Sequence, residues 1–215
     1  MNAKQLLFEQ YPVLLNCEEQ LDKALDLITT TYRHGGKLLI CGNGGSAADS
    51  EHISGELLKG FLSHRPLLAD DRRQLTDVLG NEEGNYFADR LQYGLPAIPL
   101  PSFSSLLTAY SNDVDPSLAF AQLVMALGNK GDLLLGISTS GNASNVVSAA
   151  KVARARGLKT LGLTGNQGGL LSSICDVTIR APADLTYRIQ ELHLPIYHYL
   201  CAEAERICIP KGEKE

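Results

Sequence analysis

The stretch KLLICGNGGSA (residues 37–47) combines an apolar run, a glycine-rich turn and the start of a helix. The apolar run predicts a buried strand, and glycines let the turn adopt positive φ angles and approach a ligand closely. The helix expected after the turn presents free N–H groups to an anion. Because the stretch lacks both the P-loop ending and the dinucleotide-binding spacing, it predicts either an ordinary strand-to-helix turn or a phosphate cradle.

A second loop favours the cradle. In DLLLGISTSGN (residues 132–142) another apolar run leads into three adjacent hydroxyl residues, Ser138, Thr139 and Ser140. One hydroxyl would suffice to cap the helix expected from residue 143. Three hydroxyls at a helix N-terminus match the three oxygens of a phosphate group, so the loop predicts phosphate or sugar-phosphate binding.

The rest of the chain alternates the two kinds of element. Apolar runs predict strands at 37–41, 97–100, 132–137, 159–164 and 176–180. Helical spacing predicts helices at 3–7, 14–32, 47–59, 104–110, 116–127, 143–156, near 170 and at 184–208. This order predicts an α/β fold with a parallel sheet and helices on both faces. Ligands of such sheets bind beyond the carboxyl ends of the strands, where both loops lie.

One segment departs from this alternation. Residues 63–95 are rich in charge and contain several glycines, with a short helical pattern at 71–79. Connections of this length are usually lids, interface elements or disordered segments. We interpret the segment as an insertion in a single domain spanning residues 1–215, which begins with helices in residues 1–35.

Composition limits the function classes. A length of 215 residues fits one domain, and the net charge of −5 argues against a nucleic-acid surface. No apolar stretch approaches the ~18 residues of a membrane span. The five cysteines have no metal-binding spacing, so a soluble cytoplasmic protein with reduced thiols is expected.

Ionisable side chains are placed on two of the expected helices. His52 and Glu56 are four residues apart and share a face, as in a metal clamp, an acid–base pair or a solvated polar surface. Gln190 and His198 lie eight residues apart on the last helix, about 12 Å along a straight helix. One ion can bind both only if the helix breaks at Pro195 or if one residue serves a neighbouring subunit.

Together these motifs resemble those of the phosphoheptose isomerases, which have the sugar isomerase (SIS) fold. The similarity extends over most of the chain apart from residues 63–95. The motifs that support it are the following: CGNGGSA (41–47), His52 with Glu56, Asn112-Asp113, ISTSGN (137–142), LTG (163–165) with Gly168-Gly169, and RIQE (188–191) with His193 and His198.

The resemblance implies a flavodoxin-like three-layer sandwich with a five-stranded parallel sheet. It also implies a homotetramer with active sites between subunits, whereas the expected absence of a nucleic-acid or membrane partner follows from the charge and the apolar runs above. The implied reaction interconverts sedoheptulose 7-phosphate and D-glycero-D-manno-heptose 7-phosphate through an enediolate.

The resemblance also assigns roles to residues. It implies one zinc ion per subunit, with His52, Glu56, Gln190 and His198 as ligands. It makes Glu56 and His198 the base and acid. The implied substrate contacts are Asn43, Gly44, Gly45, Ser46, Glu56, Asn112, Asp113, Ser138, Thr139, Ser140 and Gln190.

Three features depart from the family pattern. Ala143 replaces a serine of the phosphate loop, Pro195 lies within the last helix, and residues 63–95 begin close to Glu56. The alternatives are therefore an isomerase or lyase of another phosphosugar and a non-catalytic SIS regulator that binds sugar phosphates or a protein partner. The complete set of histidine, glutamate and glutamine residues favours an enzyme.

Overall fold

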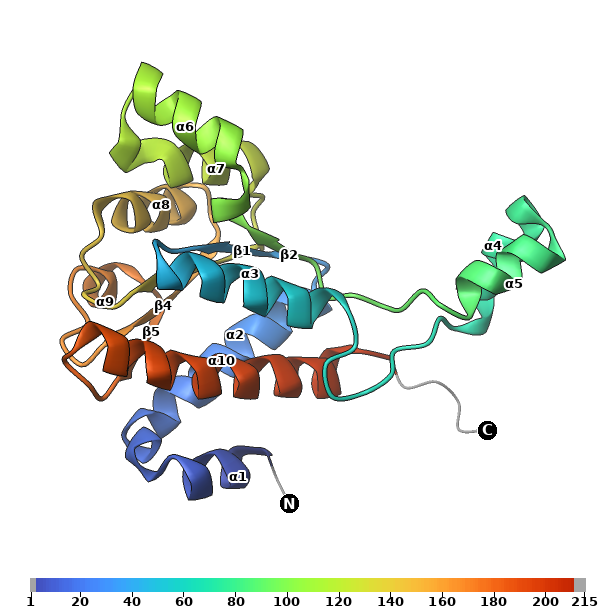
Figure 1. Cartoon of the computed structure of the whole chain (residues 1–215), viewed down its shortest axis with the longest axis horizontal. Helices are drawn as coiled ribbons and strands as arrows, with labels where there is room; N and C mark the ends of the chain where they lie inside the picture. The colour runs from blue at the N-terminus through green and yellow to red at the C-terminus, as the bar shows by residue number, and fades with distance from the viewer. Residues whose placement is uncertain (1–2, 211–215) are drawn as a thin grey trace.

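A five-stranded parallel sheet forms the centre of the protein (Figure 1). The structure is a computed structural model that describes residues 3–210. The strand order is β2-β1-β3-β4-β5. The strands are β1 (Leu38–Cys41), β2 (Ala97–Pro99), β3 (Leu133–Ser138), β4 (Lys159–Gly165) and β5 (Val177–Ala181). All four strand pairs are parallel, which confirms the predicted α/β fold class.

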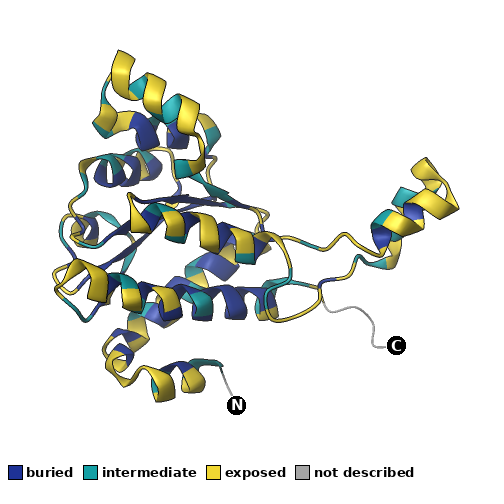
Figure 2. Cartoon of the chain, viewed as in Figure 1, coloured by how far each residue is buried: buried dark blue, intermediate teal, exposed yellow. Residues whose placement is uncertain are grey.

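Side chains alternate between the two faces of the sheet and so build two cores. Leu38 and Ile40 belong to one core, whereas Leu39 and Cys41 belong to the other. The elements that contribute to the first core are α1 (Ala3–Gln10), η1 (Pro12–Cys17), α2 (Glu18–Arg33), α3 (Gly45–Leu58) and α10 (Thr186–Cys208). The second core is built with η2 (Leu100–Ser102), α6 (Ser104–Asp113), α7 (Ala119–Leu127), α8 (Ser144–Ala155) and α9 (Leu171–Ile174). Figure 2 shows the buried sheet between these layers.

Proline explains where the observed helices differ from the expected ones. The helix expected at 14–32 is two elements, because residues 12–17 form a 3₁₀ turn that begins with Pro12. Similarly, residues 116–118 form the 3₁₀ turn η3 (Pro116–Leu118), ahead of α7. Proline fixes its own φ angle and suits the first position of a helical turn.

The last helix continues through Pro195. α10 spans residues 186–208 without interruption and contains Pro195 as a buried residue. The helix therefore does not break between Gln190 and His198. Within one chain the two side chains therefore do not meet at a single ion, and the contribution of a neighbouring subunit stays a prediction.

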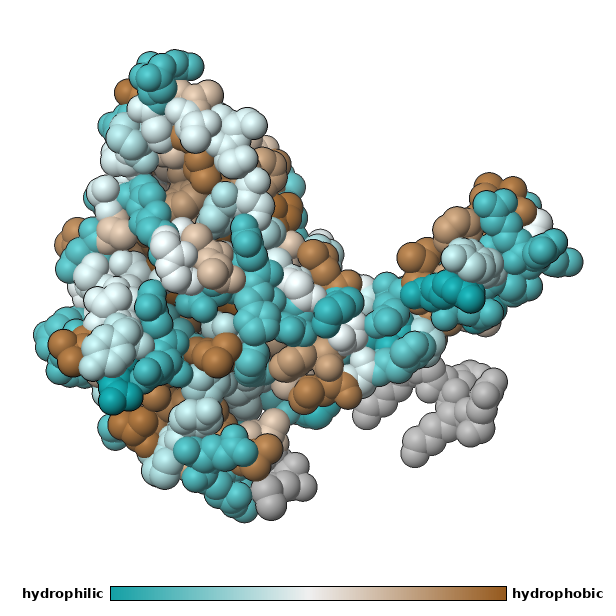
Figure 3. Space-filling view, in the orientation of Figure 1, coloured by the Kyte–Doolittle hydropathy of each residue, from teal (hydrophilic) through white to brown (hydrophobic). Residues whose placement is uncertain are grey.

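Two helices of the segment 63–95 project from the sheet layers (Figure 1). These are α4 (Ala69–Leu79) and α5 (Asn81–Ala88), which we call the arm. Gly80 has a φ of 81° in the turn that joins them. The helices pack so closely that a Cβ on Gly84 would lie 2.5 Å from the Cα of Thr76. Apolar side chains are visible on the arm surface in Figure 3.

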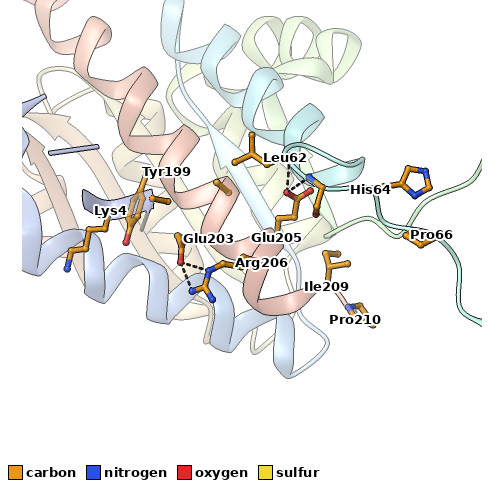
Figure 4. Close-up of a pocket in the computed structure, with 13 residues that line it drawn as sticks. Lys4, Leu62, His64, Pro66, Tyr199, Glu203, Glu205, Arg206, Ile209 and Pro210 are labelled. Carbon is orange, nitrogen blue, oxygen red and sulfur yellow. Dashed lines mark hydrogen bonds and ion pairs between the residues drawn. The ribbon is translucent and has the colours of Figure 1, made fainter. Parts of the chain in front are cut away.

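A buried ion pair fixes residues 61–65, which lead from α3 into the arm and are called the base of the arm, to α10. Arg65 is fully buried, and its Nε lies 2.7 Å from Glu205 Oε1. The same carboxylate accepts hydrogen bonds from the backbone N–H groups of Phe61, Leu62 and Ser63. Glu205 also borders a cavity of about 720 Å³ between the arm base, α1 and the end of α10 (Figure 4).

The described part of the chain has no transmembrane helix. Within residues 3–210, no helix is both long and apolar enough to cross a membrane.

Candidate active site

The turn after β1 lies against the start of α10. Gly44 has a φ of 55°, and a Cβ on Gly45 would collide with the side-chain amide of Gln190. Ser46 is buried in the first turn of α3, where its N–H donates to Asn43 O at 3.0 Å. Glycine at position 45 thus lets Gln190 reach the turn, and the structure brings these predicted substrate contacts together.

The end of β3 and the loop after it, which contain Ser138, Thr139 and Ser140 and are called the hydroxyl loop below, lie at the N-terminus of α8. The Oγ atoms of Ser138 and Ser140 are 3.5 Å apart. Ser140 Oγ accepts from the N–H of Asn142, and Ser138 Oγ accepts from the N–H of Ala143. These hydroxyls therefore bind N–H groups of the residues just before α8 and converge at the positive end of the helix, where an anion is stabilised.

An amide pair joins the two loops. Asn43 Nδ2 donates to Asn145 Oδ1, and Asn145 Nδ2 donates back to Asn43 Oδ1, both at 2.9 Å. This pair holds the turn after β1 beside the first turn of α8. The sequence reasoning missed Asn145, which is one of several polar residues after the hydroxyl loop and has no distinguishing spacing.

A further glycine turn, at residues 165–169 where β4 ends, packs against the hydroxyl loop. Gly165 N–H donates to Thr139 O at 2.9 Å, and Leu170 N–H donates to Asn142 Oδ1 at 2.9 Å. A Cβ on Gly169 would collide with the carbonyl oxygen of Ser140. The glycines at 168 and 169 therefore allow two loops to touch.

The histidine cluster lies farther along α3 and α10. His52 Nε2 is 3.2 Å from Glu56 Oε1, and the rings of His52 and His198 meet edge to face with centroids 5.1 Å apart. His198 Nε2 is buried and has no hydrogen-bond partner within residues 3–210. Burial, together with nearby His52, lowers the pKa of His198, so its imidazole is neutral at neutral pH.

Two polar side chains support His52 from the other side of its ring. Its Nδ1 lies 3.0 Å from the hydroxyl of Tyr197, and this hydroxyl lies 3.4 Å from Asp49 Oδ1. Burial and the Asp49 carboxylate raise the pKa of Tyr197, so the phenol stays protonated. The sequence reasoning missed both residues, because Tyr197 reads as one more apolar position of α10.

His193 has a different environment. It is fully buried, and its Nε2 lies 3.2 Å from Thr164 O at the end of β4. Burial lowers its pKa to about 4, so its ring is neutral and acts as a hydrogen-bond donor to the strand. This contact anchors α10 to the sheet one turn after Gln190.

Asn112 and Asp113 lie apart from the loops in sequence and in element. Both are exposed at the end of α6, where Asn112 Nδ2 donates to Asp113 Oδ1 at 2.9 Å. No hydrogen bond in the described chain joins them to the glycine turn or the hydroxyl loop. Their proposed contact with substrate stays a prediction.

One chain places the four expected metal ligands in two groups. Gln190 lies at the glycine turn, whereas His198 lies beside His52 eight residues farther along the unbroken α10. Within residues 3–210, no group of three or more histidine, cysteine, aspartate or glutamate side chains is arranged to hold a metal ion. The convergent donors are His52 and Glu56.

Comparison with known sequences identifies the domain type and the relatives of this chain. Profiles of the SIS domain match residues 12–77 and 105–196. The chain is 41% identical over 189 residues to a phosphoheptose isomerase of Aliarcobacter butzleri, which covers 88% of this chain and 86% of the relative.

Solved structures agree with the sequence comparison. A phosphoheptose isomerase of Neisseria gonorrhoeae is similar with a TM-score of 0.70 and 33% identity, covering 95% of this chain and 91% of that chain. A phosphoheptose isomerase of Francisella tularensis has a TM-score of 0.72 and 30% identity, covering 92% and 90% of the two chains.

Proposed function

The chain belongs to the phosphoheptose isomerase family of SIS-domain proteins, and on this premise we propose that it isomerises sedoheptulose 7-phosphate to D-glycero-D-manno-heptose 7-phosphate. The observation that carries the proposal is the 41% identity to a phosphoheptose isomerase over 88% of the chain. The fold supports it, because the hydroxyl loop and the glycine turn lie at the same edge of the parallel sheet.

The phosphate is expected at the N-terminus of α8. Ser138 and Ser140 offer two converging hydroxyls, and the helix offers its positive dipole end. Ala143 provides only its backbone N–H at the position where the family has a further hydroxyl. Binding of the phosphate fixes one end of the substrate, so that its carbonyl end is presented to acid and base groups.

Glu56 is proposed as the base. It takes the proton from C1 of the ketose and returns it to C2, which converts the ketose into the aldose through an enediolate. The neutral imidazole of His198 moves a proton between the two substrate oxygens as the double bond shifts. Gln190 is proposed to hold a substrate hydroxyl, because its amide lies at the glycine turn.

We also propose a zinc ion at His52 and Glu56. Histidine nitrogen and carboxylate oxygen are ordinary zinc donors, with bonds of about 2 Å. The 3.2 Å between His52 Nε2 and Glu56 Oε1 fits two ligands of one tetrahedral ion. A bound zinc ion would polarise the substrate oxygens as a Lewis acid.

The remaining ligands and the assembly belong to the same proposal. Gln190 and His198 from one straight helix would serve two different sites, so each site would combine residues of two subunits. The proposed assembly is a homotetramer. Exposed Leu6 and Leu194 beside His198 support an interface there. We place the enzyme in the cytoplasm, supported by its five free thiols.

The first prediction concerns turnover. The purified full chain is incubated with sedoheptulose 7-phosphate, with and without added zinc, and aldose formation is followed by NMR. Glu56→Gln should lower the rate by ~10²–10⁴-fold, the usual loss for a positioned base. Glu51→Gln is the matched control, because Glu51 lies on the same helix and its carboxylate accepts a hydrogen bond from Ser102 Oγ at 2.9 Å.

Each outcome has a clear meaning. Turnover that is lost in Glu56→Gln and kept in Glu51→Gln supports the isomerase. Undiminished activity of Glu56→Gln overturns the role of Glu56. Saturable binding of the sugar phosphate without turnover would instead indicate a regulator or a different phosphosugar substrate.

A further inference from the structure

Asn145 is held by its own helix and by the opposite loop at the same time. Its Oδ1 accepts the backbone N–H of Val146 at 3.0 Å and the Nδ2 group of Asn43 at 2.9 Å. Its Nδ2 donates back to Asn43 Oδ1, also at 2.9 Å. A backbone N–H can only donate, so the side-chain atom that meets Val146 must be the oxygen of Asn145. This contact fixes the orientation of the Asn145 amide, which in turn fixes that of Asn43.

Both ends of this amide pair are anchored in the core layers. Asn145 lies in the first turn of α8, where its neighbour Val146 is fully buried. Asn43 lies just before α3, and its backbone carbonyl accepts the N–H of buried Ser46 at 3.0 Å. Because β1 and β3 are neighbours in the sheet, the pair joins the two segments that follow these strands. The pair therefore links two elements whose positions the sheet already fixes.

The pair leaves further hydrogen-bonding capacity on Asn43. An asparagine amide has two N–H donors and an oxygen with two lone pairs. The pair uses one donor and one lone pair of Asn43, and its side chain makes no other hydrogen bond within residues 3–210. One N–H and one lone pair therefore remain for a ligand, on a side chain whose orientation is already fixed.

Asn43 connects the expected phosphate site with the residues around Gln190. Its side chain is bonded to the first turn of α8, and the same glycine turn continues to Gly45, which lies against the amide of Gln190. We infer that Asn145 is a positioning residue, which holds the Asn43 amide so that it can bind a hydroxyl group in the sugar chain of a phosphorylated substrate. The inference rests on the proposed function for the identity of this ligand. Its evidence is the amide pair and the hydrogen-bonding groups that the pair leaves unused.

The order imposed on Asn43 should matter for the sugar and not for the phosphate group. Immobilising one exposed side chain on binding typically weakens an interaction by ~2–12-fold. Without Asn145, the Asn43 side chain would rotate freely in the unbound protein, and a bound sugar would have to order it. Inorganic phosphate is expected to contact the hydroxyl loop alone, so its affinity should not depend on the pair.

The second prediction is that Asn145→Ser raises the KM for sedoheptulose 7-phosphate by ~2–12-fold with little change in kcat. Serine keeps an oxygen at the start of α8 but is too short to reach Asn43. Lys151→Ser is the matched control, because Lys151 is an exposed residue of the same helix. The dissociation constant of inorganic phosphate, measured by calorimetry, should be the same in the native protein and in both variants.

A double-mutant cycle separates positioning from a structural role. Asn43→Ala removes the residue through which Asn145 acts, so Asn145→Ser should have no further effect on KM in that background. If Asn145 only stabilised the start of α8, its substitution would cause the same loss with and without Asn43. That result would overturn the inference, as would a proportional loss of inorganic phosphate binding.

NMR tests the amide pair without any substrate. The full chain is labelled with ¹⁵N, and the side-chain amide signals of Asn43 are identified by their loss in Asn43→Ala. These signals should shift and exchange faster with water in Asn145→Ser but not in Lys151→Ser, and unchanged signals would also overturn the inference. If the native protein binds the sugar phosphate without turnover, calorimetric dissociation constants replace KM. A native protein that does not bind it would contradict the proposed function, and the amide signals would then decide whether Asn145 holds Asn43.

Discussion

Glu205 holds the base of the arm through four hydrogen bonds. Its carboxylate accepts three backbone N–H groups of residues 61–63 and pairs with the fully buried Arg65. Arg65 in turn donates to the carbonyl oxygens of Leu57 and Glu56, at the end of α3. This one carboxylate thus connects α10 to the loop after α3. Through Arg65 the connection extends to Glu56, a residue of the proposed site.

The third prediction is that Glu205→Gln destabilises the protein. Glutamine keeps the size of the side chain but leaves the buried guanidinium of Arg65 without an anion. Breaking a buried ion pair from one side typically costs ~3–5 kcal/mol in the free energy of unfolding. Urea denaturation at neutral pH measures this cost. Glu19→Gln is the control, since Glu19 and its partner Lys23 are 70% and 58% exposed and such surface pairs contribute little to stability.

The same pair predicts a dependence on pH. Burial opposes ionisation of Glu205, but the hydrogen bonds from Phe61 and Arg65 outweigh it, so its pKa lies below the ordinary 4.5. The unfolded chain therefore binds this proton more readily than the folded chain. The stabilisation that ionised Glu205 contributes is complete above pH 4.5, and it is lost as the pH falls through the lowered pKa of Glu205 in the folded protein. The difference between native protein and Glu205→Gln should shrink over that interval; a constant difference would contradict the assignment.

Residues differ in how far the sequence alone could predict them. His52 and Glu56 were predicted to share a face, because helical spacing fixes which side chains are neighbours on one helix. Asn145 and Tyr197 were not found, since their partners Asn43 and His52 lie more than a hundred positions away. Contacts of that kind depend on tertiary packing, which periodicity does not encode.

At the scale of elements, the arm is stabilised mainly by its own two helices. Gly84 and Ala88 are the buried residues of α5, and α4 has none. Val78 is 82% exposed and Tyr86 is 55% exposed. A short hairpin with this little burial depends on the close contact of its two backbones.

The fourth prediction tests that contact. In Gly84→Val the new side chain would overlap the backbone of Thr76 and force the helices apart. Hydrogen exchange should become faster throughout residues 69–88. The unfolding free energy of the sheet layers should change by less than ~0.5 kcal/mol, as for substitutions outside the core. Glu83→Val places the same side chain at the exposed neighbouring position and should leave exchange unchanged. Equal protection in both variants would show that the close packing is unimportant.

The elements themselves were largely predictable. Apolar runs bounded by turn residues located all five strands. The signal is clearest for β1 and β3, because strands buried on both faces need a continuous run of apolar side chains, whereas the edge strands β2 and β5 are only partly buried. The 3₁₀ turn at residues 12–17 was missed, because its apolar residues fit a longer helix equally well. The helix expected at 71–79 is present as part of α4, but its partner α5 was not predicted, since Gly84 weakens the helical pattern there.

At the scale of the whole molecule, the strand order β2-β1-β3-β4-β5 is the flavodoxin-like order that the family resemblance implied, whereas the apolar runs alone did not predict it. The order places β1 beside β3, so that the glycine turn and the hydroxyl loop become neighbours. Non-consecutive pairing of this kind follows from how the crossover helices pack. The two loops could be recognised separately, but their link through Asn43 and Asn145 required the fold.

The length of α10 leads to the last prediction, which concerns subunits. If each site takes Gln190 from one subunit and His198 from another, Gln190→Ala and His198→Ala should each abolish most activity alone. When the two variants are mixed during refolding or are co-expressed, a site formed between unlike subunits can contain both native residues. Random pairing in a symmetric oligomer makes about a quarter of the sites intact, so about a quarter of native activity should return. If both residues of a site came from one chain, no mixed site would be intact and activity would stay at the level of the single variants.

A mixture of His198→Ala with Glu56→Gln would then show whether Glu56 and His198 come from the same subunit, as their common contact with His52 in one chain leads us to expect. In that case this second mixture should recover nothing, because no site would have both residues.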